Sequence, residues 1–510
     1  MPEISDKHHR TNLFGSAYLK DPTTIFTKKV LVTGNEVYLK TSNGILTIKT
    51  LVNLTCRYLD KIYLEIPQSL DKLSTELEKI VLDTNSEIIF SKPKECDIVI
   101  SVGNIPESKN FTITIGSDGW VSFLACNNRI SSKINSYQNP IGAMGASVFG
   151  SAEVFKRILE ISGCKEKWTI DHPSNYTFSF LDYSLSQNNS NFPNNIELLE
   201  EIILVGAGAV GSSFTYAISS ISNVSGNITT IDNESFDVTN LNRCLICYNN
   251  TIGTSKSEVT TKYSTKTLKF SSFVGTFRDY IKKFTHCSPI VISTVDNNEA
   301  RFQIQSELPK LIFHGATGKN ISAISTIKLL ENACLGCIFE NNSTQEEIIS
   351  IETGIPLPEV KRLFEKDDIF SEVHFHYMKK RLGDKAEKFS KNIGQKFSNF
   401  YVKEVCGQIT AETSEGTKTP SVSFVSFFSG LVLTSELVKF HSSDLKEIPM
   451  LNSLDFLQFN LFIPTLYHIV RRPKNPNCLI NCSSTNIQEV FAEKWNLKLI
   501  KNIGEKKNGL

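Results

Sequence analysis

The sequence lacks the features that would direct it to nucleic acid, a membrane or secretion. Its 54 Lys and Arg nearly cancel its 53 Asp and Glu, leaving a net charge of +1, so no overall field favours nucleic acid or an anionic membrane. The start, MPEISDKHHRTNLFG, has no apolar core of a signal peptide. The most apolar helix candidate, Ser421 to Phe440, is interrupted by serines and by Glu436, which argues against a membrane span. We therefore expect a cytoplasmic protein.

The cysteine content is also informative because no secretory signal accompanies it. The 12 cysteines in 510 residues fit a reducing compartment better than a disulfide framework. A chain of this length holds about two to four domains and can bury a large core. Apolar and charged fractions of 40% and 21% are typical of globular proteins.

One stretch organises the rest of the chain. The apolar run Ile202–Val205 predicts a buried parallel strand. A G-x-G-x-x-G pattern follows it, made of Gly206, Gly208 and Gly211. Such glycines allow a tight turn, close approach of phosphate to the backbone, and close packing of helix on strand. A second strand ends on Asp232, which is placed to hydrogen-bond a ribose. This pattern predicts a nucleotide site.

The residues that follow decide between a dinucleotide and ATP. The polar run Thr239–Arg243 comes directly after the second strand, and its guanidinium and amide donors (Arg243, Asn240) suit the β- and γ-phosphates. Lys256 adds a second cation, about one helical turn from that loop. Asp296, after the apolar strand IVISTVD, offers a hard oxygen ligand for Mg²⁺. ATP with Mg²⁺ is therefore the expected ligand, although a glycine pattern alone would also fit NAD.

At these motifs the sequence resembles the ThiF/MoeB/ubiquitin-activating superfamily, whose members adenylate the C-terminal carboxylate of a ubiquitin-like protein. The matching pieces are GAGAVG (206–211), ID-NESFDVTNLNR (231–243), the IG-x-x-K pattern that ends on Lys256, and STVDNNEAR (293–301). One residue departs from the family pattern: Cys244 stands where the family usually has Gln, a change that we expect to affect packing more than chemistry.

The resemblance implies an α/β fold with two Rossmann-like adenylation units in one chain, the N-terminal degenerate and the C-terminal active, with a helical insertion. Residues 1–181 have the rhythm of such a unit without its glycines. Within them, GILTIKTLVNLTCRYLDKIYLEIP, which starts at Gly44, predicts a strand, a helix and a strand, and large side chains at Thr50–Tyr58 stand where we expect the phosphate loop. An unrelated α/β domain is the alternative. The polar stretch 182–196 reads as a linker, the active unit spans 197–482, and 483–510 is a tail.

Three site features depend on this resemblance. Arg10 is a candidate for the N-terminal arginine that reaches into the ATP site of the neighbouring unit; the alternative is a solvated basic tail. The charged, helically periodic segment 340–405 would be the insertion, in which we interpret His374 and His376 as surface residues. Cys406, between that insertion and the returning helix 419–440, is the candidate nucleophile, because a thiol can displace AMP from an acyl adenylate. The alternative is a buried, unreactive thiol.

Two further pairs of cysteines indicate a metal site. Their pattern is C-x-x-C followed much later by C-x-x-x-C, made of Cys334, Cys337, Cys478 and Cys482. Four thiolates satisfy tetrahedral Zn²⁺ and close its coordination shell, so this zinc would stabilise the fold. The second knuckle has one residue more than the family's. The other cysteines are interpreted as packing residues, with Cys244 and Cys247 the least certain.

The sequence thus predicts an ATP-dependent enzyme that activates a ubiquitin-like protein by adenylation and then forms a thioester. A conjugating enzyme and a second copy of the chain are candidate partners, and nucleic acid and membrane are not. Adenylation that feeds sulfur transfer or amide formation is one rival. An NAD-dependent oxidoreductase and a non-catalytic nucleotide-binding scaffold are the others, and the first of these is disfavoured by Arg243, Lys256 and the cysteine pairs.

Overall fold

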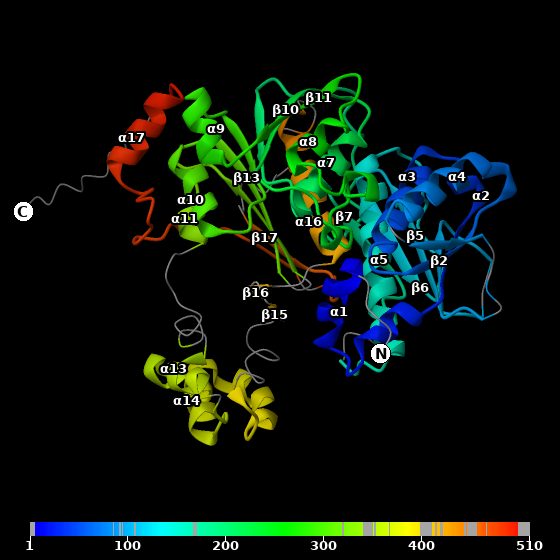
Figure 1. Ribbon diagram of the computed structural model, residues 1–510, viewed down its shortest axis with the longest axis horizontal. Coiled ribbons are helices and arrows are strands. Elements are labelled where there is room, and N and C mark those ends of the chain that lie inside the picture. The colour runs from blue at the N-terminus through cyan, green and yellow to red at the C-terminus, as the bar shows by residue number, and fades with distance from the viewer. Residues whose placement is uncertain are drawn as a thin grey trace, which may run out of the picture.

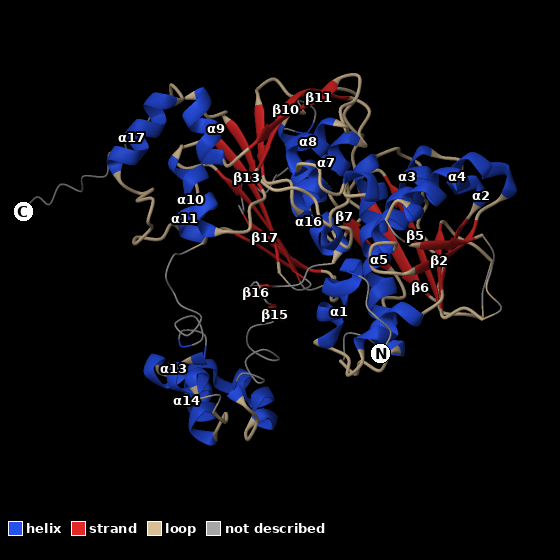
Figure 2. Ribbon diagram, in the orientation of Figure 1, coloured by secondary structure: helices blue, strands red, loops and turns tan. Residues whose placement is uncertain are grey.

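Two large sheets form the framework of the chain (Figures 1 and 2). The computed structural model describes residues 6–84, 86–90, 93, 95–106, 109–166, 171–318, 321–339, 350, 353–366, 368–397, 411–413, 416–418, 422–442, 445, 456–465 and 467–497. The described strands are coloured red and the helices blue in Figure 2.

The first sheet has the strand order β3-β2-β1-β4-β5-β6-β7. Its strands are β1 Val30–Gly34, β2 Lys61–Glu65, β3 Glu87–Ile89, β4 Ile98–Val102, β5 Thr112–Asp118, β6 Val121–Cys126 and β7 Tyr176–Ser179. The five strands from β3 to β5 are parallel, and β6 and β7 are antiparallel. A buried parallel core of this kind requires apolar, β-branched strands, such as the fully buried IVISV of β4.

The second sheet repeats this order as β11-β10-β9-β12-β13-β14-β17-β18, with β8 paired to β10. Its strands are β8 Ile196–Glu197, β9 Ile202–Val205, β10 Val224–Asp232, β11 Leu268–Val274, β12 Ile290–Ser293, β13 Leu311–Thr317, β14 Ile321–Ile327, β17 Phe456–Asn460 and β18 Tyr467–Val470. The strands from β11 to β13 are parallel, and those from β14 onward are antiparallel. The predicted fold, two Rossmann-like units in one chain, is therefore confirmed. A small hairpin joins β15 Ala411–Thr413 to β16 Gly416–Lys418.

The helices of the first unit are η1 Asp6–His8, α1 His9–Ser16, η2 Pro22–Thr27, α2 Glu36–Leu39, α3 Ser42–Thr55, η3 Gln68–Leu70, α4 Asp71–Leu82 and α5 Pro140–Ile161. Those that follow are α7 Ala209–Ser219, η4 Val238–Asn240, η5 Asn249–Thr251, α8 Lys256–Thr261, α9 Phe277–Phe284, α10 Asn298–Ser306, α11 Leu335–Ile338, α13 Leu357–Glu365, α14 Glu372–Leu382, η6 Gly383–Asn392, α16 Ser423–Phe440 and α17 Thr485–Lys494. We propose the two sheets as two domains, 1–181 and 197–482, joined by 182–196.

Equivalent helices of the two units pack against one another at their junction. α5 lies between β6 and β7 in the chain, as α16 lies between β14 and β17, and α5 contacts α16. α16 also packs on α7, where Gly430 permits close approach, because a Cβ there would lie 2.6 Å from the backbone nitrogen of Phe214. By length and composition α16 could cross a membrane, but 94% of its apolar window is buried inside the protein. Its apolar character is thus accounted for by the core.

The charged residues of α16 are paired. Glu436 and Lys439 are both buried, and Lys439 Nζ lies 2.6 Å from Glu436 Oε1. The buried Tyr183 hydroxyl donates to Glu436 and accepts from Lys439 Nζ at 3.0 Å. Buried charges require such partners, and this network fixes the start of the 182–196 segment to the second unit.

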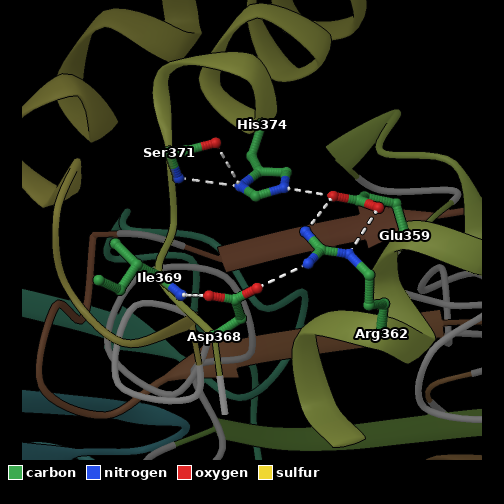
Figure 3. Close-up of polar contacts among 6 residues, drawn as sticks. All are labelled: Glu359, Arg362, Asp368, Ile369, Ser371 and His374. Atoms are coloured by element: carbon green, nitrogen blue, oxygen red, sulfur yellow. Dashed lines mark hydrogen bonds and ion pairs between the residues drawn. The ribbon is translucent and has the colours of Figure 1, made fainter. Parts of the chain in front are cut away.

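The predicted helical insertion is present as α13, α14 and η6, which pack around their own apolar core (Figure 1, lower left). Figure 3 shows the polar network that joins α13 to α14 and to the segment between them. Glu359 accepts from Arg362 and from His374 Nε2 at 2.8 Å, and His374 Nδ1 accepts from the Ser371 N–H at 2.8 Å. Hydrogen bonds from Arg362, then from His374, lower the pKa of Glu359 to about 2. The interpretation of His374 as a surface residue was wrong: it is 3% exposed.

Two sequence-based expectations for the first unit were also wrong. The segment from Gly44, read as a strand, begins inside α3, because its N-cap Thr41 accepts from the Gly44 N–H and starts a helix there. Thr50–Tyr58 therefore forms the end of α3 and the turn after it. The turn that corresponds to a phosphate loop instead follows β1, at Gly34 and Asn35.

Candidate nucleotide site and cysteine cluster

A cavity of about 1100 Å³ opens at the carboxyl ends of β9, β10, β12 and β13. β9 lies between β10 and β12, so the strand order reverses at this point, which is where open α/β sheets bind ligands. The predicted residues that line it come from four separate segments: Gly206, Gly208, Asp232, Asn240, Arg243, Lys256 and Asp296. Among the predicted nucleotide residues whose side chains the structure describes, the fold thus brings together all except Gly211.

The glycine turn shapes one wall of the cavity. Gly206 has φ +91°, which disfavours other residues. Gly211 lies one turn into α7, and a Cβ there would sit 2.0 Å from the carbonyl oxygen of Gly206. A Cβ on Gly208 would meet no protein atom, so that position keeps open space beside the helix N-terminus. Free N–H groups and the positive end of α7 suit a phosphate there.

Asp232 lies at the end of β10, as the ribose prediction requires. Its carboxylate accepts from the N–H of Ala207 at 2.6 Å and from the N–H of Glu234 at 2.8 Å. Burial raises the pKa of Asp232, and the two N–H donors partly offset this effect. The carboxylate therefore joins the glycine turn to the second strand and has further lone pairs for a ligand hydroxyl.

Two cations also line the cavity. Arg243 Nη1 donates to the carbonyl of Thr239 at 2.6 Å and to Asn242 Oδ1 at 3.0 Å, which fixes the guanidinium. Lys256 is buried and forms an ion pair with the exposed Glu234. Burial lowers the pKa of Lys256, but the hydrogen bond to Glu234 and the nearby Asp232 raise it overall. Both cations are suited to phosphate oxygens.

The segment after β12 supplies the predicted acid Asp296 and two further groups, Glu299 and Arg301, that the sequence alone did not identify. The exposed Asp296 and Glu299 both line the cavity, and carboxylates of this kind fit Mg²⁺. Arg301 is 8% exposed and also lines it. Its guanidinium lies 4.0 Å from the centre of the Phe339 ring, and burial lowers its pKa to about 10, against the effect of Asp296. The motif STVDNNEAR ends on Arg301, so the signal was present in the sequence.

The first unit has a tyrosine at the equivalent strand ends. Tyr38 is 4% exposed, and its hydroxyl lies 2.9 Å from the N–H and 3.1 Å from the Oγ of Ser117, near the end of β5. Gly34 and Asn35 at the end of β1 carry no G-x-G-x-x-G pattern, and a Cβ on Gly34 would lie 2.8 Å from Leu39. Large side chains therefore occupy the place where the second unit has its cavity.

The N-terminal segment packs against the nucleotide loop of the second unit. η1 contacts η4, which ends on Asn240. Lys7 and His8 are each 2% exposed, and His8 Nε2 lies 2.5 Å from Asp60. The alternative of a solvated tail is thus wrong for these residues. Arg10 follows in α1, and its side chain is outside the described part of the structure.

The four predicted cysteines form one cluster. Their sulfur atoms all lie within 4.8 Å of one another. The Cys334–Cys337 separation is 3.7 Å, and those of Cys334–Cys478 and Cys337–Cys482 are 3.4 Å. Sulfurs around tetrahedral Zn²⁺ lie about 3.8 Å apart, given Zn–S bonds of about 2.3 Å, so the residues fit zinc.

Neighbouring residues support this arrangement. A Cβ on Gly336 would lie 3.1 Å from Cys478 Sγ, so glycine permits the close approach. Asn481 has φ +53°, a left-handed conformation that asparagine tolerates, and this turn absorbs the extra residue of the second knuckle. The Asn475 N–H donates to Cys337 Sγ at 3.3 Å, and Lys474 Nζ donates to the carbonyl of Leu329 at 2.7 Å.

Three further cysteines bear on the predicted site. Cys406 lies outside the described residues, so its role as nucleophile stays a prediction. Cys244 and Cys247 are 1% and 0% exposed and pack with Phe236, Leu241 and Val259. Burial raises the pKa of Cys247 to about 12, which disfavours its thiolate. Their apolar surroundings agree with a packing role, although Cys244 also lines the cavity.

Comparison with known proteins identifies relatives. The sequence model of the ThiF family matches residues 195–480. The curated protein y4jF of Sinorhizobium fredii (strain NBRC 101917 / NGR234), described as uncharacterized, is 26% identical over 445 residues, 82% of each chain. Among solved structures, E. coli MccB with SeMet MccA is 12% identical, with a TM-score of 0.36, over 72% of this chain and 97% of that one. E. coli MccB without a named ligand gives the same identity and TM-score over 95% of its length.

Proposed function

The chain belongs to the ThiF family of adenylating enzymes, and we propose that its second unit adenylates the C-terminal carboxylate of a ubiquitin-like protein. The observation that carries this proposal is the cavity of the second unit. Seven residues predicted from four separate motifs line it together. A cavity of about 1100 Å³ is also large enough for a nucleotide and the end of a second substrate.

We assign the roles from position. The N-terminus of α7 and the turn Gly206–Gly208 hold phosphate, and Asp232 holds the ribose. Arg243 and Lys256 neutralise the β- and γ-phosphates, whose charge must leave as pyrophosphate when the carboxylate attacks the α-phosphate. Asp296 would hold Mg²⁺, which supplies further charge neutralisation when bound. Arg10 would add a cation from the N-terminal segment.

Two observations support the distinct roles of the two units. The second unit carries the glycines, the cations and the cavity, whereas Tyr38 and Leu39 occupy the equivalent strand ends of the first. The first unit also contacts the nucleotide loop through η1 and η4. We therefore propose one ATP site per chain, supported by a unit that has lost its own.

After adenylation, we propose that Cys406 attacks the acyl adenylate, forms a thioester and releases AMP, and that a conjugating enzyme then accepts the acyl group. The other outcome, adenylation that feeds sulfur transfer or amide formation, uses the same cavity and differs only in the nucleophile. We propose a structural role for zinc at the four-cysteine cluster, and a cytoplasmic location, in which the thiols stay reduced.

The test uses the full chain, ATP, Mg²⁺ and a candidate ubiquitin-like protein. ATP–pyrophosphate exchange that depends on the added protein is the expected result, and Asp296→Asn should abolish it while leaving thermal unfolding unchanged, because Asp296 is exposed. Asp71→Asn, which changes an exposed carboxylate on α4 of the first unit, is the matched control. Binding of ATP without any carboxylate-dependent exchange would contradict the proposal and favour a nucleotide-binding scaffold.

A second assay separates the two steps. Cys406→Ala should keep the exchange reaction and lose the thiol-sensitive adduct between enzyme and partner. If the unmutated enzyme supports exchange but forms no such adduct, the sulfur-transfer or amide-forming alternative replaces the thioester.

A further inference from the structure

Three metal-ligating side chains of different kinds meet beside the C-terminal half of α5, in the first unit. In the sequence they lie well before the residues proposed to bind nucleotide. Cys126 ends β6, Glu153 lies on α5, and His172 lies in the segment before β7. Their ligand atoms all lie within 4.8 Å of one another. Cys126 and Glu153 are 5% and 4% exposed, and the side chain of His172 is 9% exposed.

The neighbours of these side chains are arranged as they are around bound metals. His172 Nδ1 faces Glu153 Oε1, while His172 Nε2 lies 3.0 Å from Glu160 Oε2. A metal-bound histidine almost always donates its second N–H to a carboxylate or carbonyl in this way. Lys156 Nζ lies 3.0 Å from Glu153 Oε2, so it holds the oxygen that does not face the histidine.

We propose that Cys126, Glu153 and His172 form a metal site for Zn²⁺ in the first unit, separate from the four-cysteine cluster. A thiolate, an imidazole and a carboxylate are all ligands that zinc accepts, and the sulfur selects against Mg²⁺ and Ca²⁺. The set supplies one sulfur, one nitrogen and one oxygen, and a water molecule completes a tetrahedron. Binding releases the thiol proton of Cys126 to solvent, because the ligand is the thiolate.

The site has a mechanical consequence for the first unit. It joins β6, the C-terminal half of α5 and the segment that leads into β7, three consecutive pieces of the first unit. α5 is also the helix that packs against α16 of the second unit. The metal would thus hold the C-terminal half of the helix that packs against the second unit.

The competing explanation is an ion-pair network without metal. In that case His172 lies between Glu153 and Glu160, and Lys156 and Arg157 pair with the two carboxylates. The two explanations differ in Cys126, whose thiol lies against Glu153 in the ion-pair network but is a thiolate ligand in the metal site. They also differ in Glu160, which affects metal binding only if the site exists.

The experiment measures zinc bound to the purified full chain by elemental analysis, and Co²⁺ bound after exchange by absorption. We expect about two zinc ions per chain in the unmutated protein, and about one after Cys126→Ser or His172→Gln. Cys164→Ser is the matched control, because Cys164 is in the same unit and equally buried, at 5% exposed. Glu160→Gln keeps all three ligands and should weaken metal binding at this site by about 10–100-fold in a competition with a chelator.

Two results would overturn the proposal. One is a zinc content that Cys126→Ser leaves unchanged relative to Cys164→Ser. The other is a Glu160→Gln protein that binds metal as tightly as the unmutated chain. If Cys126→Ser does not fold, the difference between the Co²⁺ spectra of the unmutated and His172→Gln proteins still decides, because loss of a single-thiolate site removes sulfur-to-cobalt charge transfer and an ion-pair network has none to lose.

Discussion

Replacing Arg57 tests whether the first unit supports the nucleotide site of the second. Arg57 follows α3 and is fully buried. Its Nη1 donates to the carbonyl of Leu241 at 2.9 Å and to that of Cys247 at 3.2 Å, and Nη2 donates to that of Leu245 at 2.8 Å. One guanidinium therefore fixes both ends of the loop that carries Arg243.

The magnitude follows from the acceptors that would be left behind. Arg57→Met keeps much of the volume but removes every donor, so the three carbonyls and Asn53 Oδ1 lose this partner in a buried environment. Each buried unsatisfied group costs about 1–3 kcal/mol. Because the loop can relax and admit water, we expect a loss of about 3–5 kcal/mol in the free energy of unfolding. A displaced loop should also raise the KM for ATP, since Asn240 and Arg243 lie within or beside it.

The assay combines urea unfolding with ATP–pyrophosphate exchange on three variants. Arg57→Lys keeps the charge but not the planar fork, so it should fall between the unmutated chain and Arg57→Met in both measurements. Arg129→Met removes an exposed arginine of the same unit and should change neither.

An Arg57→Met protein with an unchanged unfolding midpoint and an unchanged KM for ATP would refute this reasoning. Lower stability with an unchanged KM would mean that Arg57 joins the units without positioning the loop.

Three further predictions concern single side chains. Gly211→Ala should destabilise the second unit, because its Cβ would meet the Gly206 carbonyl, whereas Gly208→Ala should leave thermal unfolding unchanged and weaken ATP binding. Burial, followed by the charge of Arg301, lowers the pKa of His314 from 6.5 to about 3. Below pH 6.5 the unfolded chain therefore binds a proton that the folded chain does not. The free energy of unfolding should decrease by about 1.4 kcal/mol for each unit by which the pH is lowered, as the contribution of this group. Replacing it (His314→Asn) should flatten that slope in urea unfolding from pH 6 to 4. Cys482→Ser should remove the zinc of the four-cysteine cluster and lower stability by several kcal/mol, measured by elemental analysis and calorimetry.

Much of the second unit was predictable because its signals are local. An apolar run, three glycines and an acid at a strand end depend on neighbours within about 30 residues, and their spacing fixes a βαβ unit with a nucleotide turn. The two cysteine pairs were predictable for a similar reason, since thiol spacing alone indicates a tetrahedral site. These features determined the family, the fold class and the position of the cavity.

Other features were decided only by contacts between distant residues. The misplaced strand at Gly44 arose because a capping threonine, not β-branched composition, sets the start of α3. His374 was misjudged because its partner Glu359 lies on another helix. Arg57 and Leu241 are 184 residues apart, and Cys126, Glu153 and His172 meet only when β6, α5 and β7 pack. No local pattern records such contacts, because they depend on how the sheets and helices stack.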